Sequence, residues 1–69
     1  MTTTEHQILA EIATTGQAVI QLFKPREAKA AETLRSQRII YIEAGNDLIW
    51  VVKFGRAPFG HQAREIAQG

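Results

Sequence analysis

Three observations in the sequence predict a small α+β domain made of two helices and a C-terminal β-hairpin. Helix-capping residues precede an apolar stripe near the start of the chain, a proline opens a second run of helix formers, and two apolar, β-branched runs flank a turn. The 69 residues have room for one domain. We expect its folded core at residues 4–54.

The first predicted helix runs from Glu5 to Thr14. Thr2 and Glu5 have the spacing of a capping box, in which a hydroxyl and a carboxylate satisfy free amides at a helix start. One apolar stripe follows them, formed by Ile8, Leu9, Ile12 and Ala13. Gly16 suits the left-handed position that closes a helix.

The segment from Gln17 to Phe23 fits two structures. Its polar residues recur at helical spacing, and its apolar residues also alternate as they would in a strand. The β-branched pair Val19-Ile20 and the short length between Gly16 and Pro25 favour a third short strand. The sequence alone leaves both structures open.

The second predicted helix follows Pro25, which suits a first helical position because its missing amide hydrogen would have had no partner there. Arg26 to Gln37 consists mostly of good helix formers. Its narrow apolar face is formed by Ala30, Ala31 and Leu34. These residues are mostly small, so we expect the helix to pack closely against a neighbour.

A β-hairpin is predicted from Arg38 to Phe54, with its turn at residues 44–47. If Ala44 pairs with Asp47, one all-aliphatic face is expected in the core: Ile40, Ile42, Ile49 and Val51. The opposite face is more mixed and is the predicted interaction surface, represented by Tyr41, Leu48, Trp50 and Val52. Residues 55–69 contain two glycines and a proline near their start, which predicts either a short helix or a mobile tail.

The residue types of most catalytic and metal sites are missing or scattered. The chain has no cysteine, its one serine has no histidine nearby in sequence, and His6 and His61 stand far apart. We therefore expect no enzymatic activity, no metal site and no cofactor. The lack of cysteine, of a basic leader and of a long apolar segment predicts a soluble cytoplasmic protein without a membrane span.

Cations are concentrated in the middle of the chain. Residues 24–38 hold five cations against two carboxylates, a local charge of +3, although the whole chain carries only +1. Together with one lysine of the hairpin they are the predicted nucleic-acid-binding residues: Lys24, Arg26, Lys29, Arg35, Arg38 and Lys53. Because Glu27 and Glu32 lie among them, a solvated charged face is the alternative interpretation.

A helix that leads directly into a hairpin, with another helix near the start, resembles the end of a winged-helix DNA-binding domain, and the resemblance covers Pro25 to Lys53. In that family the last helix enters the major groove and the hairpin is the wing. The resemblance implies a small DNA-binding regulator of transcription with contacts on the helix and wing cations. The family also has one more helix before the recognition helix, so Gln17 to Phe23 must supply that helix or the first strand.

The alternative function is a protein-interaction or adaptor module without catalysis. It would dock through the Tyr41/Trp50 face of the hairpin or through an exposed strand edge. A core of this size usually supplies no more than about 3–5 kcal/mol of stability, so we also expect a homodimer or a protein partner.

Overall fold

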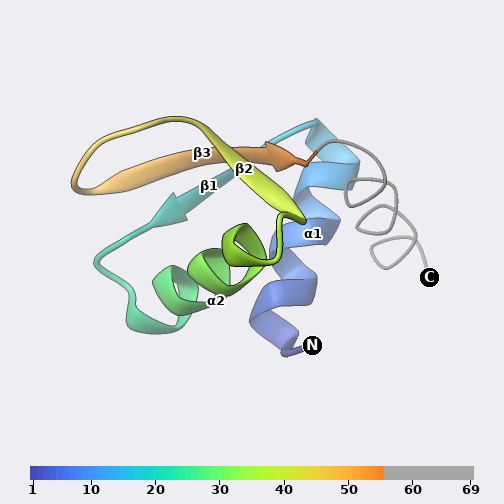
Figure 1. The fold of residues 1–69 in the computed structure, drawn as a ribbon, viewed down its shortest axis with the longest axis horizontal. Helices are drawn as coiled ribbons and strands as arrows, with labels where there is room; N and C mark the ends of the chain where they lie inside the picture. The colour runs from blue at the N-terminus through green and yellow to red at the C-terminus, as the bar shows by residue number, and fades with distance from the viewer. Residues whose placement is uncertain (56–69) are drawn as a thin grey trace.

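The structure, a computed structural model, describes residues 1–55 as a three-stranded antiparallel sheet with two helices on one face (Figure 1). The elements follow in the order α1 (Thr3–Thr15), β1 (Ala18–Gln21), α2 (Pro25–Ser36), β2 (Ile40–Gly45) and β3 (Ile49–Phe54). The predicted α+β class is confirmed. The predicted helix or tail at 55–69 lies, apart from Gly55, outside the described residues.

The first helix begins and ends as its capping residues predict. The Glu5 amide donates to Thr2 Oγ1 at 3.1 Å, and the Thr2 hydroxyl donates to Glu5 Oε1 at 3.0 Å. At the other end Gly16 has a φ of 93°, and its amide donates to the Ile12 carbonyl at 2.7 Å. This left-handed conformation strains any residue that has a Cβ, which explains the glycine.

The ambiguous segment is a strand. Ala18–Gln21 pairs antiparallel with β3, with Ala18 opposite Val52 and Ile20 opposite Trp50. The sheet order is therefore β1-β3-β2, with β3 in the centre. Residues 17–23, which a winged-helix domain would use as a helix or as its first strand, thus contain a strand. The one helix between β1 and β2 is α2.

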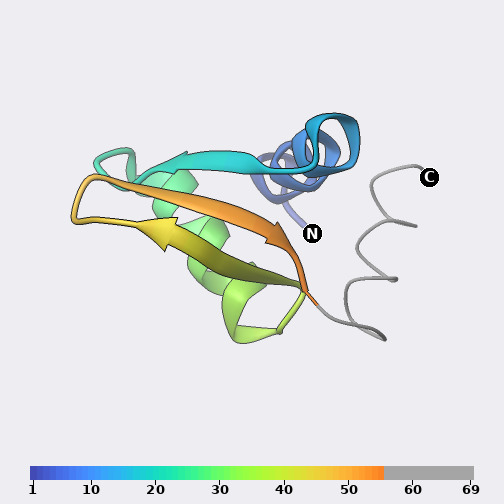
Figure 2. The same ribbon diagram turned by 90° about the horizontal axis from the view of Figure 1, so that it is seen from above.

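Both helices cover the same face of the sheet, and the core lies between these two layers (Figure 2). The largest fully buried side chains come from four different elements: Leu9, Ile20, Leu34 and Val52. The apolar face predicted for the second helix, Ala30, Ala31 and Leu34, is buried in this core. Within residues 1–55 no helix lies over the opposite, outer face of the sheet.

The hairpin has a different register from the predicted one. Gly45 pairs with Trp50, where we expected Ala44 to pair with Asp47, and a β-bulge lies between Ile42 and Ala44. Ile42 therefore faces Val52, and Ile40 faces Phe54. Each of these partners lies three residues further along β3 than predicted. Because side chains alternate between the two faces of a strand, a shift by an odd number exchanges the two faces of β3.

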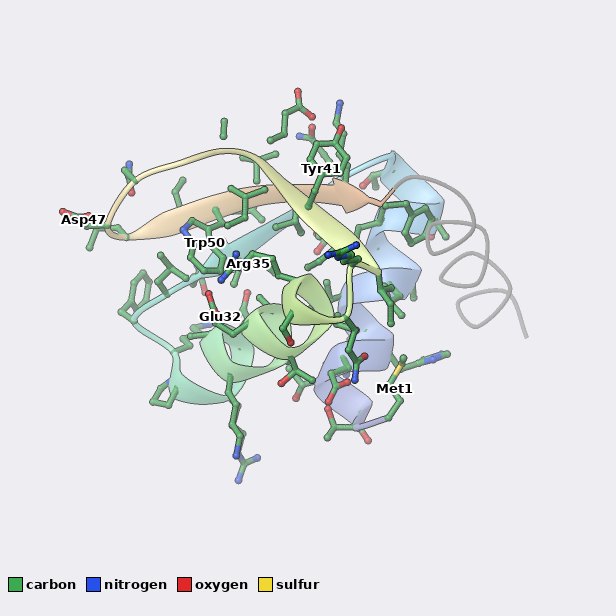
Figure 3. The ribbon with its side chains drawn as sticks, in the orientation of Figure 1. Met1, Glu32, Arg35, Tyr41, Asp47 and Trp50 are labelled. Carbon is green, nitrogen blue, oxygen red and sulfur yellow. The ribbon has the colours of Figure 1, made fainter. Side chains whose placement is uncertain are left out.

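This exchange corrects the predicted interaction surface. Val52 is fully buried, and the partly buried Trp50 packs against the core. Tyr41 lies on the outer face opposite Lys53 and is 45% exposed. Figure 3 shows Tyr41 and Trp50 on opposite sides of the sheet, so the predicted Tyr41/Trp50 face does not exist. Ile49 and Val51 leave the predicted aliphatic core face for the same reason.

Candidate functional site

The predicted nucleic-acid-binding cations do not form one continuous surface. Arg26 and Arg35 are nine residues apart on α2, and at about 100° per residue they lie on opposite flanks of the helix. Arg26 and Lys29 line a hollow beside the start of α1. Lys24, at the N-cap of α2, lines a neighbouring hollow with Arg26.

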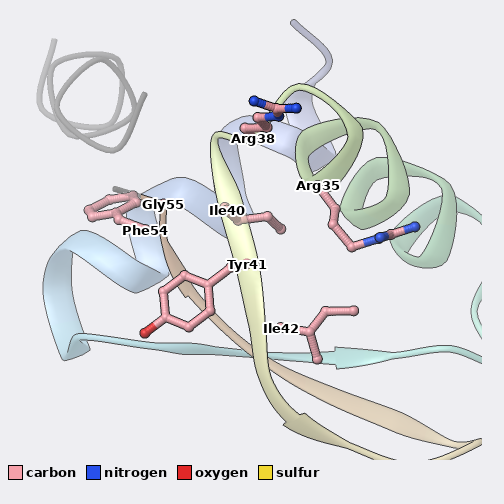
Figure 4. A pocket seen from close by; sticks show the side chains of 7 residues that line it. All are labelled: Arg35, Arg38, Ile40, Tyr41, Ile42, Phe54 and Gly55. Atoms are coloured by element: carbon pink, nitrogen blue, oxygen red, sulfur yellow. The ribbon is translucent and has the colours of Figure 1, made fainter. Parts of the chain in front are cut away.

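Two of the predicted cations, Arg35 and Arg38, line one groove of about 790 Å³. Seven residues line it: Arg35, Arg38, Ile40, Tyr41, Ile42, Phe54 and Gly55. Figure 4 shows Arg38 at one end of β2, Arg35 on the α2 side of the strand and Tyr41 on its other side. We call this the β2-edge groove. It combines two guanidinium groups with an exposed aromatic ring.

The groove follows the free edge of β2, which is an outer strand of the sheet in the described part of the chain. The Gly55 amide donates to the Ile39 carbonyl at 2.8 Å, so the Ile39 carbonyl, one residue before β2, points toward β3. Because bonding alternates along an antiparallel strand, the backbone groups of Ile40 and Ile42 point away from β3. Both residues line the groove, and their outward backbone groups can donate to or accept from a ligand at the strand edge.

The other outer strand, β1, has part of its edge satisfied within the domain. The Gln21 amide, which points away from β3, donates to Glu27 Oε1 at 3.1 Å. The sequence places Glu27 only among the carboxylates of a charged face, and sequence spacing does not reveal its contact to Gln21. The two outer strands therefore differ, and the β2 edge is the better place for a ligand.

Arg35 is held by a carboxylate on its own helix. Its Nε donates to Glu32 Oε1 at 3.3 Å and its Nη2 to Glu32 Oε2 at 3.1 Å, and both side chains are about half exposed. An exposed pair of this kind contributes little stability, typically about 0.2–1 kcal/mol. A phosphate can therefore compete for the Arg35 guanidinium at small cost.

Arg38 has an unusual backbone conformation, which no feature of the sequence predicts. Its φ is 62°, and among residues 1–55 it is the one residue other than glycine with a positive φ. It is the left-handed residue of a Schellman motif, since the Ile39 amide donates to the Leu34 carbonyl at 3.0 Å and the Arg38 amide to the Arg35 carbonyl at 2.9 Å. Glycine is the usual residue at this position, so the arginine is retained at a cost in backbone strain.

Gly55 fixes the backbone of Arg38 from the opposite side. A Cβ added to Gly55 would collide with the Arg38 carbonyl oxygen. The end of β3 and the end of α2 are thus in close backbone contact, and this contact positions Arg38 at the mouth of the β2-edge groove.

Lys53 lies on the outer face of the sheet opposite Tyr41 and is not among the residues that line the groove. Its Nζ is 2.6 Å from Glu43 Oε2. The hydrogen bond and the charge of Glu43 raise the pKa of Lys53 above its ordinary value. Lys53, like Arg35, is therefore paired with a carboxylate that is partly exposed.

The outer face of the sheet exposes apolar side chains as well. Val19 is 43% exposed and Tyr41 is 45% exposed, and Val51, the cross-strand partner of Val19, is partly exposed. Leu48, from the predicted interaction surface, is 62% exposed in the turn before β3. This outer face is distinct from the Tyr41/Trp50 face predicted from sequence.

Other kinds of site have little support in the described part of the chain. Among residues 1–55, no three His, Cys, Asp or Glu side chains gather as metal ligands would. Neither helix in this range combines the length and the apolar character that crossing a bilayer requires.

Comparison of the chain with protein-family models, with curated proteins and with solved structures finds no match.

Proposed function

We propose that this protein is a small nucleic-acid-binding protein that holds its ligand in the β2-edge groove. The observation that carries the proposal is that Arg35, Arg38 and Tyr41 all line one groove, with Tyr41 on the other side of β2 from Arg35 (Figure 4). Guanidinium groups bind phosphates through paired, charge-assisted hydrogen bonds, and an aromatic ring offers a stacking surface for a base.

The groove cations are also accessible to a ligand. Arg38 is exposed, and the carboxylate that holds Arg35 is exposed too, so neither guanidinium is locked inside the protein. With two phosphate contacts, affinity should fall about tenfold between 50 and 200 mM salt, from the usual slope of about −0.7 to −0.9 per contact.

The proposal keeps the DNA-binding function that the winged-helix resemblance implies but moves the contacts. A helix lying in a major groove would use the exposed side of α2, where Lys29 and Arg26 stand. The proposed ligand lies instead along the flank that faces β2. In the cell, we propose that the protein is a cytoplasmic regulator of transcription.

The test is binding of labelled single-stranded and duplex DNA of mixed sequence, followed by fluorescence anisotropy in low salt. The wild type is compared with the double variant Arg35→Gln/Arg38→Gln and with the matched control Lys24→Gln/Lys29→Gln, which loses the same charge outside the groove. We expect at least one DNA form to bind, the groove variant to lose about tenfold or more, and the control to lose far less. No binding by the wild type, or equal losses in both variants, would contradict the proposal.

A second function, self-association or protein binding through the outer face, is favoured by the exposure of Val19 and Tyr41 on a sheet surface that neither helix covers. Sedimentation of the wild type against Val19→Asp tests it. A wild-type dimer that dissociates in the variant supports this function, and a wild type that stays monomeric at high concentration without any protein partner opposes it.

A further inference from the structure

We propose that the nucleic acid in the β2-edge groove is single-stranded, with one base stacked on Tyr41 and the adjacent phosphates on Arg35 and Arg38. This inference rests on the proposed function and narrows it to a ligand class. Four features of the described residues carry it.

The first feature is the position of the cations. A duplex is read by an element that protrudes into one of its grooves, and such an element presents its contacts on one side. Arg35 and Arg38 instead line a concave surface beside a strand edge, and Arg26 lies on the opposite flank of α2. A flexible single strand can enter a concavity that the stiff body of a duplex cannot.

The second feature is the Tyr41 ring. It is the one tyrosine of the chain, it is 45% exposed, and it lies on the side of β2 away from Arg35 (Figure 4). A ligand that reaches both must cross the edge of β2. An unpaired base can stack on this ring, whereas the bases of a duplex are already stacked on one another.

The third feature is the set of backbone groups between the cations and the ring. Ile40 and Ile42, whose amides and carbonyls point away from β3, are among the residues that line the same groove. The edges of unpaired bases can form hydrogen bonds with them. An extended peptide could use the same groups, but two arginines at the groove favour a ligand with a negative charge at every unit, which nucleic acid has and most peptides lack.

The fourth feature is the strained backbone of Arg38. Most residues pay a conformational cost at a φ of 62°, and the Schellman motif would accept glycine there. An arginine at this position is explained if its guanidinium has a ligand. The strain thus points to the same groove as the charge and the ring.

The experiment measures the affinities of a short labelled oligothymidylate and of a hairpin duplex for the wild type, Tyr41→Phe and Tyr41→Ala. We expect the single strand to bind more tightly than the duplex. Tyr41→Ala should weaken single-strand binding by about tenfold or more, and Tyr41→Phe, which keeps the ring, should stay within about twofold. Proton spectra of the wild type give a second measurement, because a base stacked on Tyr41 should move its ring signals upfield. This measurement needs no variant and so does not depend on whether a variant folds.

The outcomes separate this inference from the proposed function. If the duplex binds at least as tightly as the single strand, or if Tyr41→Ala binds like the wild type and the ring signals stay in place, the inference fails while nucleic-acid binding stands. If neither DNA form binds, both fail. Binding of an acidic peptide in place of both DNA forms overturns the inference in favour of a peptide-docking edge.

Discussion

The left-handed Arg38 leads to an unusual prediction, namely that Arg38→Gly makes the protein more stable and weakens its ligand binding. A residue with a Cβ in this conformation costs roughly 1–2 kcal/mol. Glycine removes this strain but adds flexibility to the unfolded chain, which costs about 0.4–1 kcal/mol. The net expectation is a gain of about 0.8 kcal/mol, the middle of a range of about 0–1.6 kcal/mol.

The predicted gain is measurable because the domain is small. A change of 1 kcal/mol moves the Tm of a domain of this size by about 4–8 °C, so thermal unfolding followed by circular dichroism should show a rise of a few degrees for Arg38→Gly. The matched control is Arg38→Ala, which also removes the guanidinium but keeps the Cβ and therefore the strain.

The reasoning is refuted if the glycine variant unfolds at or below the temperature of the alanine variant. Strain would then not be the property that distinguishes this position. The two variants should weaken DNA binding to the same extent, because both lack the guanidinium. A stable glycine variant with wild-type affinity would remove Arg38 from the proposed site.

Three further predictions follow from the packing and the ion pairs. Leu34→Ala removes a side chain with no exposed surface, which should lower the free energy of unfolding by about 2–5 kcal/mol and leave much of the protein unfolded before denaturant is added. Leu48→Ala, at a position that is 62% exposed, should change the denaturant titration little. Gly16→Ala, at a φ of 93°, should lower the Tm by about 4–8 °C through strain of about 1 kcal/mol, and an unchanged Tm would refute the left-handed C-cap. Glu32→Gln frees Arg35 and should tighten DNA binding about two- to threefold in low salt, as expected from an exposed pair of roughly 0.5 kcal/mol, and weaker binding would show that Glu32 positions Arg35 for the ligand.

The sequence predicted the helices well because their ends are marked by residues with local physical roles. Thr2, Gly16 and Pro25 each satisfy or remove a backbone group at a helix end, and the helices begin and end within two residues of the predicted positions. The third strand was favoured by its β-branched residues. This strand forms because it pairs with β3, and the residues of the segment alone do not show that pairing.

The hairpin faces could not be predicted because register depends on a turn and a bulge whose energies differ little from those of their alternatives. Asn46 Oδ1 accepts from the amides of Leu48 and Ile49 at 2.7 and 3.0 Å, and this contact moves the turn beyond the predicted pairing. Gly45 then lies against Trp50, where a Cβ would come within 2.6 Å of the indole. One shift of register moved Trp50 and Val52 into the core.

The candidate site was predictable in its charges and not in its shape. Arg35 and Arg38 belonged to the predicted set because cations are visible in any sequence. The separation of Arg35 from Arg26 follows from helical geometry. The groove that Arg35 and Arg38 share with Tyr41 depends on how the end of α2 packs against β2. The left-handed Arg38 left no signal, because arginine is not a residue from which a Schellman motif is inferred.

Titration of isotope-labelled protein with oligothymidylate, followed at every backbone amide, shows whether the ligand lies in the β2-edge groove. The account predicts that the largest shifts cluster at Arg35, Arg38, Ile40, Tyr41 and Ile42. Shifts concentrated at Arg26 and Lys29 on the other flank of α2, or no shifts at all in low salt, would contradict it.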